Sequence, residues 1–133
     1  MKKLIQLPII TLSLFLLTSS SFAQTTTSWK GTGSTSWTNA ANWTNGLPSV
    51  TVSAIVGDAN FTGTFQPKIS SAITCLNLTL GGTKATTLTS SKAFTIAGNL
   101  LINTNGTLTQ GKGGLSIAGN WTNNGSFSAT TNT

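Results

Sequence analysis

Few residues of this chain can take part in acid–base or metal chemistry. Of its 133 residues 6% are charged, with 7 Lys+Arg, 1 Asp+Glu and no His. The one acid is Asp58 and the one thiol is Cys75. General acid–base catalysis needs a titratable group placed beside the substrate, and metal sites need clustered His, Cys, Asp or Glu. Because neither set can be assembled, the sequence predicts a protein that is not an enzyme, with no catalytic residues, no metal ligands and no cofactor.

The remaining charged residues and the thiol do not indicate another chemistry. The formal net charge is +6 at pH 7, but the basic residues are scattered lysines, whereas nucleic-acid-binding proteins gather Lys and Arg on one face. We therefore expect no nucleic acid partner. Cys75 has no His to activate it and no second cysteine to pair with, so it is predicted to be a small apolar strand residue.

The beginning of the chain has the pattern of an export signal. Lys2 and Lys3 precede an apolar run over residues 4–17, and small residues stand three and one positions before Gln24. This pattern predicts a signal peptide over residues 1–23, cleaved between Ala23 and Gln24. The alternative is a membrane anchor, but the run is shorter than the ~20 residues of a spanning helix. We expect an exported mature chain without a membrane span, located outside the cell or on the outer surface of a Gram-negative-type bacterium.

The elements that position the remaining residues are short strands. Apolar and polar residues alternate in the segments 50–54, 76–80, 94–96 and 115–117, a period of two that is typical of β-strands. Glycines and Asn-Gly pairs between these segments allow sharp turns. An all-β fold is therefore expected.

Two internal repeats predict how the strands stack. Pentapeptides of similar pattern begin at Leu78, Phe94 and Leu115, and a second column contains the triplets Thr87-Leu88-Thr89, Thr107-Leu108-Thr109 and Ser126-Phe127-Ser128. Two columns in constant order favour a parallel β-helix, or β-solenoid, of about three rungs over residues 73–133. In this interpretation the three pentapeptides lie above one another. An antiparallel β meander or sandwich is the alternative.

The segment before the repeats is rich in tryptophan. Trp29, Trp37 and Trp43 fall within fifteen residues, and we interpret residues 24–72 as an N-terminal β cap that covers the first rung. The alternative is a platform of exposed tryptophans that stack on sugars. The cap is preferred because sugar sites commonly add acids, Arg or Tyr for hydroxyl recognition, and these are scarce or missing.

Several motifs together resemble a family of bacterial surface proteins. They are the segments 37–43, 46–48, 66–69 and 75–80, followed by the Ile-Ala-Gly-Asn rungs. This set is similar to the N-terminal region of large, repeat-bearing, adhesin-type proteins, of the kind exported by type IX secretion. The resemblance implies a stalk of parallel β-helix. Members of that family are longer, so we expect the protein to continue beyond Thr133.

The leading hypothesis is therefore a non-catalytic, secreted or cell-surface solenoid that serves as an adhesin-like stalk or display module. Its expected partners are cell-surface or extracellular glycans or proteins, and the open last rung is expected to support self-association. An alternative is a glycan-binding module that uses Trp37, Trp43 or Trp121. A further alternative is ice binding by the threonine face formed by Thr87, Thr89, Thr107 and Thr109.

Overall fold

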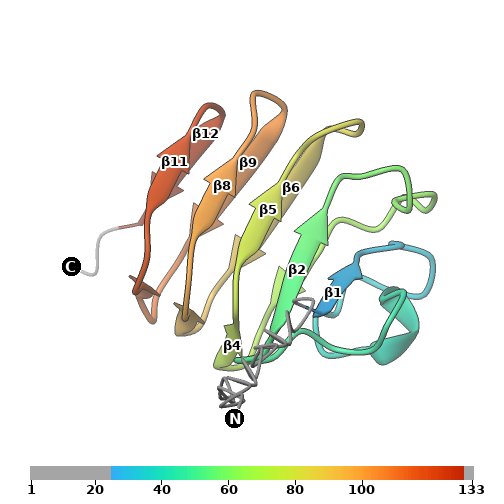
Figure 1. The fold of residues 1–133 in the computed structure, drawn as a ribbon, viewed down its shortest axis with the longest axis horizontal. Coiled ribbons are helices and arrows are strands. Elements are labelled where there is room, and N and C mark those ends of the chain that lie inside the picture. Colours follow the sequence, from blue (N-terminus) through green and yellow to red (C-terminus); the bar gives the residue numbers. More distant parts are fainter. Residues whose placement is uncertain (1–24, 131–133) are drawn as a thin grey trace, which may run out of the picture.

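The computed structural model describes residues 25–130, which wind into a stack of coils (Figure 1). Short strands alternate with tight turns, and one 3-10 helix, η1 (Ala40–Asn42), lies near the N-terminal end of the stack. The strands are β1 (Thr25–Ser28), β2 (Val52–Val56), β3 (Lys68–Ile69), β4 (Ile73–Cys75), β5 (Leu78–Leu80), β6 (Thr86–Ser90), β7 (Phe94–Ile96), β8 (Leu100–Ile102), β9 (Gly106–Gln110), β10 (Leu115–Ile117), β11 (Trp121–Asn123) and β12 (Ser126–Ala129).

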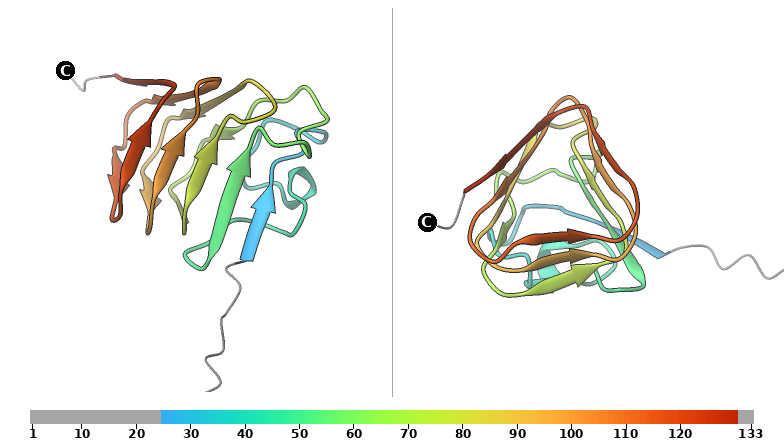
Figure 2. Two further views of the ribbon diagram at one scale, coloured as in Figure 1. Left: turned by 45° about the horizontal axis from the view of Figure 1, so that its top comes forward. Right: turned by 90° about the vertical axis from the view of Figure 1, so that its left-hand side faces the viewer.

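Each full coil contributes one strand to each of three sheets. The sheets have the orders β1-β2-β5-β8-β11, β10-β7-β4 and β12-β9-β6-β3. Viewed along the stack, the three sheets form the sides of a triangle (Figure 2). Successive coils pair in parallel and in register, so each residue lies above its counterpart one turn earlier.

This architecture confirms the predicted parallel β-solenoid. The named strands of the described residues all pair in parallel, which excludes the antiparallel alternative. The stack has about four turns, one more than expected, because the segment assigned to the cap supplies strands of its own. In that segment β1 and β2 extend the five-stranded sheet and β3 extends the four-stranded sheet.

The predicted stacking is correct for one column and wrong for part of the other. Leu88 lies between Leu108 and the earlier coil, and Phe127 follows Leu108 in register, as expected. Phe94 and Leu115 are also in register, but Leu78 belongs to a different sheet, where it pairs with Leu100. The pentapeptides resemble one another because the five-stranded and three-stranded sheets both place an apolar residue before and after one outward residue. The pattern alone therefore does not identify the side.

The inward positions of the three sheets form one continuous core. Members from each sheet are fully or almost fully buried: Leu78, Leu80, Leu100 and Ile102; Cys75, Phe94 and Ile96; Ile69, Leu88 and Leu108. Complete burial of one Leu, Ile or Phe side chain contributes about 1.5–3 kcal/mol. A single coil cannot bury these side chains by itself, so this stabilisation depends on the neighbouring coil.

Asparagines at one corner connect successive coils. The Oδ1 atom of Asn77 accepts a hydrogen bond from the backbone N–H of Asn99 at 2.7 Å, and Oδ1 of Asn99 accepts one from the N–H of Asn120 at 2.8 Å. Gly98 and Gly119 precede the two donors, and a Cβ at either position would collide with the asparagine side chain one turn earlier. The repeated Gly-Asn pair thus leaves room for one asparagine and supplies the next.

We expect Asn99→Ala to lower the free energy of unfolding by about 0.5–1.5 kcal/mol, because the N–H of Asn120 loses its acceptor. Asn99→Asp is the matched control, since its carboxylate keeps an acceptor at the same place. Urea unfolding followed by circular dichroism measures both variants. Equal losses in the two variants would show that the corner hydrogen bond does not stabilise the stack.

Candidate functional site

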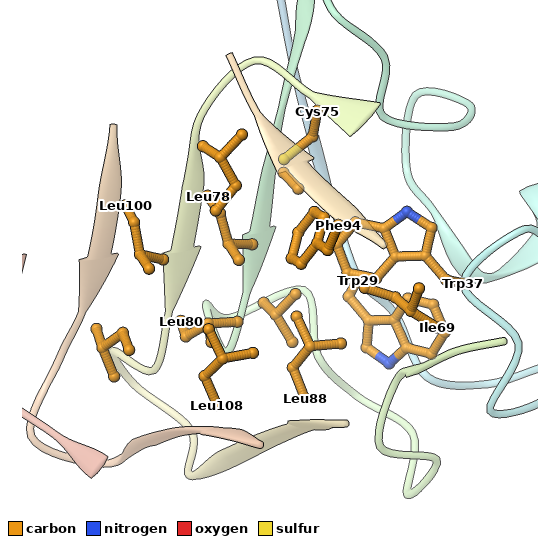
Figure 3. Packing of buried hydrophobic residues seen from close by; sticks show 14 of the residues in the cluster. Trp29, Trp37, Ile69, Cys75, Leu78, Leu80, Leu88, Phe94, Leu100 and Leu108 are labelled. Atoms are coloured by element: carbon orange, nitrogen blue, oxygen red, sulfur yellow. The ribbon is translucent and has the colours of Figure 1, made fainter. Parts of the chain in front are cut away.

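The three tryptophans at the N-terminal end pack against one another. Trp43 makes edge-to-face contacts with Trp29 and Trp37, with ring centroids 5.1 and 4.7 Å apart. Trp37 also contacts Phe94 at 5.7 Å, which joins the cluster to the aliphatic core (Figure 3). The indole N–H groups of Trp29 and Trp43 donate to the carbonyls of Phe65 and Trp37, each at 2.8 Å.

Burial decides what these rings can contact. Trp37 and Trp43, two of the three candidate glycan contacts, are 3% and 2% exposed, so neither ring face is open to a sugar. Trp121, the third candidate, is 45% exposed. A glycan platform made of several neighbouring tryptophan rings therefore does not exist in the described part of the chain.

The outward positions of the four-stranded sheet carry a regular array of hydroxyl groups. One column contains Thr87, Thr107 and Ser126, and the other contains Thr89, Thr109 and Ser128. We call these six residues the hydroxyl face. Neighbouring strands of a sheet lie about 4.8 Å apart, and alternate residues along a strand about 6.6 Å apart, so the array is nearly rectangular.

The hydroxyl face contains all four threonines of the predicted ice-binding face. Leu88 and Leu108 lie between the two columns and point into the core, with no exposed surface. Lys68 is in register with Thr89 at one end of the array. The six residues themselves carry no ionisable group, so the array can offer methyl groups and hydrogen bonds but no acid–base chemistry.

The last described coil, β10 to β12, leaves core positions uncovered, and we call it the open coil. Trp121 is in register with Leu100 and, one turn earlier, Leu78, both of which point inward and are buried. Its indole packs edge-to-face against Phe127, with centroids 4.7 Å apart. Phe127 likewise continues the column of Leu108. Trp121 is therefore exposed because no described residue lies over it, and not because its position faces outward.

The Cys75 thiol is part of the core, and the Asp58 carboxylate is held by hydrogen bonds. Cys75 is completely buried, and burial raises the pKa of its thiol to about 12, so the thiol stays protonated at neutral pH. Asp58 accepts hydrogen bonds from the Ser28 hydroxyl at 2.6 Å and from the Asn60 side-chain amide at 2.9 Å. Among residues 25–130 no group of three or more His, Cys, Asp or Glu is placed to hold a metal ion.

Ala23 and Gln24, the predicted cleavage site, lie outside the described residues, as does the predicted signal peptide. Within the described residues, no helix is long and apolar enough to cross a membrane.

A groove beside β4 is not predicted by the sequence. Its cavity of about 470 Å³ lies between β4 and the turn that contains Leu47 and Val50. The feature of the sequence that could have indicated an apolar surface is the presence of Leu47 and Val50 around Pro48, in a turn where polar residues are usual. The groove itself could not be predicted, because residues 37–38, 47–50 and 73–74 come together only in the folded chain.

Comparison with known proteins does not assign a family. No protein-family model, no curated protein and no solved structure matches the chain.

Proposed function

We propose that this protein is an exported, non-catalytic β-solenoid that acts as a stalk or display module on the outer surface of a Gram-negative-type bacterium. Three features support the proposal: the export pattern of residues 1–23, the scarcity of ionisable groups, and the resemblance of several motifs to adhesin-type surface proteins. The expected partners are glycans or proteins at the cell surface or outside the cell.

The observation that carries the proposal is the open coil. Trp121 and Phe127 continue columns of buried leucines, yet Trp121 is 45% exposed. The strands β10, β11 and β12 also end their sheets, so within residues 25–130 each has a backbone edge with no neighbouring strand. Stacked repeats gain stability from every added neighbour. The open coil is therefore suited to extension by another coil, which is how a stalk grows or two molecules associate.

The first experiment tests export. The full chain is produced in a Gram-negative bacterium, and an antibody and intact-mass measurement follow its location and length. We expect cleavage between Ala23 and Gln24 and accessibility to protease added outside the cell. The matched variant Ala23→Lys places a charge at the cleavage site and should accumulate the uncut form. Uncut wild-type protein in the cytoplasm would contradict the proposal.

The second experiment tests the open coil as a stacking surface. Sedimentation velocity of the purified protein should show association that increases with concentration, because association covers Trp121 and pairs the strand edges. Trp121→Lys should abolish it by placing a charge in the contact. Thr122→Lys adds the same charge at the adjacent outward position and should associate like wild type. A wild-type protein that stays monomeric at all concentrations would contradict the stacking role.

A second candidate function is ice binding by the hydroxyl face. The observation that favours it is the register of the six hydroxyl residues, which repeats methyl and hydroxyl groups at regular intervals on one side of a rigid stack. Stacked threonines also suit any solvent-facing strand, so the pattern alone does not establish the function.

Thermal hysteresis of the purified protein tests this candidate. If the hydroxyl face binds ice, wild type should depress the freezing point below the melting point. Thr107→Lys should remove the effect, because it interrupts the middle of the array. Thr95→Lys, on the three-stranded sheet, should retain it. A wild-type protein without hysteresis would eliminate ice binding.

A further inference from the structure

The first turn of the stack protects two of its three sheets with its own chain. At β3, the N–H of Lys68 donates to the carbonyl of Thr35 at 2.7 Å, and the N–H of Trp37 donates to the carbonyl of Lys68 at 3.0 Å. At β1, the N–H of Thr44 donates to the carbonyl of Ser28 at 3.0 Å. Segments that are not regular strands thus cover the terminal edges of both sheets.

No segment of the described chain covers the terminal edge of the third sheet in this way. It ends at β4, in the order β10-β7-β4. The N–H of Ile73 donates to Ala93 at 3.1 Å, and the carbonyl of Cys75 accepts from Ala97 at 2.9 Å, so both residues bond toward β7. In a parallel ladder the intervening residue, Thr74, directs its N–H and carbonyl to the opposite side. Among the described residues no strand lies there to pair with Thr74.

The free edge of β4 borders the apolar groove. Ile73 and Thr74 line one side of the 470 Å³ cavity, and Trp37, Leu47 and Val50 are also among its lining residues. Leu47 and Val50 are 42% and 58% exposed, and none of the lining residues is charged. Sheet edges are protected by very short strands, charges, prolines or bulges, and β4, with the sequence Ile-Thr-Cys, is short but has no charge and no proline. An unpaired backbone and exposed apolar side chains therefore occur at the same place.

The three-stranded sheet specifies what kind of segment would fit. Its strands β4, β7 and β10 place apolar residues, or Cys75, on the inward side and Thr74, Thr95 or Ser116 on the outward side. A strand added beside β4 would follow the same alternation. Its apolar side chains would enter the groove near Ile73 and Trp37, and a hydroxyl residue would lie beside Thr74.

We propose that the β4 groove is a strand-addition site for an extended, uncharged peptide segment of apolar–hydroxyl–apolar pattern, supplied by another polypeptide. Main-chain hydrogen bonds to Thr74 provide affinity, and the apolar groove selects the side chains, as in other recognition by β-augmentation. The occupant continues a ladder that already joins β10, β7 and β4. A small apolar molecule would fill the cavity but would leave the backbone of Thr74 unpaired.

The test uses a labelled synthetic peptide with the sequence of residues 113–119, Gly-Gly-Leu-Ser-Ile-Ala-Gly, which has the required pattern. Fluorescence anisotropy measures its binding to the purified protein, and NMR measures hydrogen exchange at the Thr74 amide. We expect saturable binding and at least tenfold slower exchange at Thr74. A peptide with both the Leu and the Ile replaced by Asp should not bind.

Three variants locate the binding. Val50→Lys introduces a charge at an exposed position of the groove and should weaken binding at least tenfold. Phe65→Lys changes an exposed apolar residue outside the groove and should bind like wild type. Trp121→Lys should also bind like wild type, because addition at β4 does not involve the open coil. Circular dichroism and urea unfolding verify that each variant is folded.

The results distinguish strand addition from other forms of binding. Binding with unchanged exchange at Thr74 would overturn the proposal in favour of simple occupation of an apolar cavity. Loss of binding in Trp121→Lys but not in Val50→Lys would place the peptide at the open coil and would also overturn it. Absence of binding at millimolar peptide would reject the site altogether. None of these outcomes depends on export or on self-association.

Discussion

The parallel, in-register pairing of successive coils is the constraint on which the rest of this molecule depends. The strands of each coil have only two to five residues, too few to bury the inward side chains without a neighbouring coil. Pairing in register places Phe94 over Ile73 and Leu108 over Leu88, so the burial of one coil requires the next. The same pairing aligns the corners, where the backbone N–H of Asn99 donates to Asn77 one coil earlier and its side-chain Oδ1 accepts from Asn120 one coil later.

This constraint also determines which surfaces remain for function. Side chains that point inward are committed to packing, and outward positions on short strands favour Thr and Ser. The two reactive groups follow the same division, since Cys75 is buried in the core and Asp58 holds a turn through Ser28 and Asn60. What remains is largely uncharged: the hydroxyl face, the open coil and the edge of β4. Recognition by such surfaces depends on shape and hydrogen bonding more than on charge.

The sequence was sufficient to predict the fold class but not the assignment of strands to sides. The period of two and the column of Leu88, Leu108 and Phe127 led to the parallel solenoid. The prediction for Leu78 is wrong because the five-stranded and three-stranded sheets have the same local alternation. The Gly-Asn pairs before β8 and β11 identify the side better, since each depends on an asparagine one turn earlier. The groove could not be predicted, because it depends on which segments lie next to each other in space.

The proposed interactions are extensions of the forces that hold the molecule together. A coil added at Trp121 and a strand added at Thr74 would each supply a parallel or antiparallel ladder and cover apolar side chains, as the internal coils do for one another. The two ends of the stack differ in how well the chain protects its sheet edges against the addition of further strands. At the N-terminal end Trp37 and Trp43 close the core, and residues near Thr35 and Thr44 cover two sheet edges. Because an unprotected edge favours uncontrolled association, this partial protection restricts strand addition at that end to a single side of the triangle.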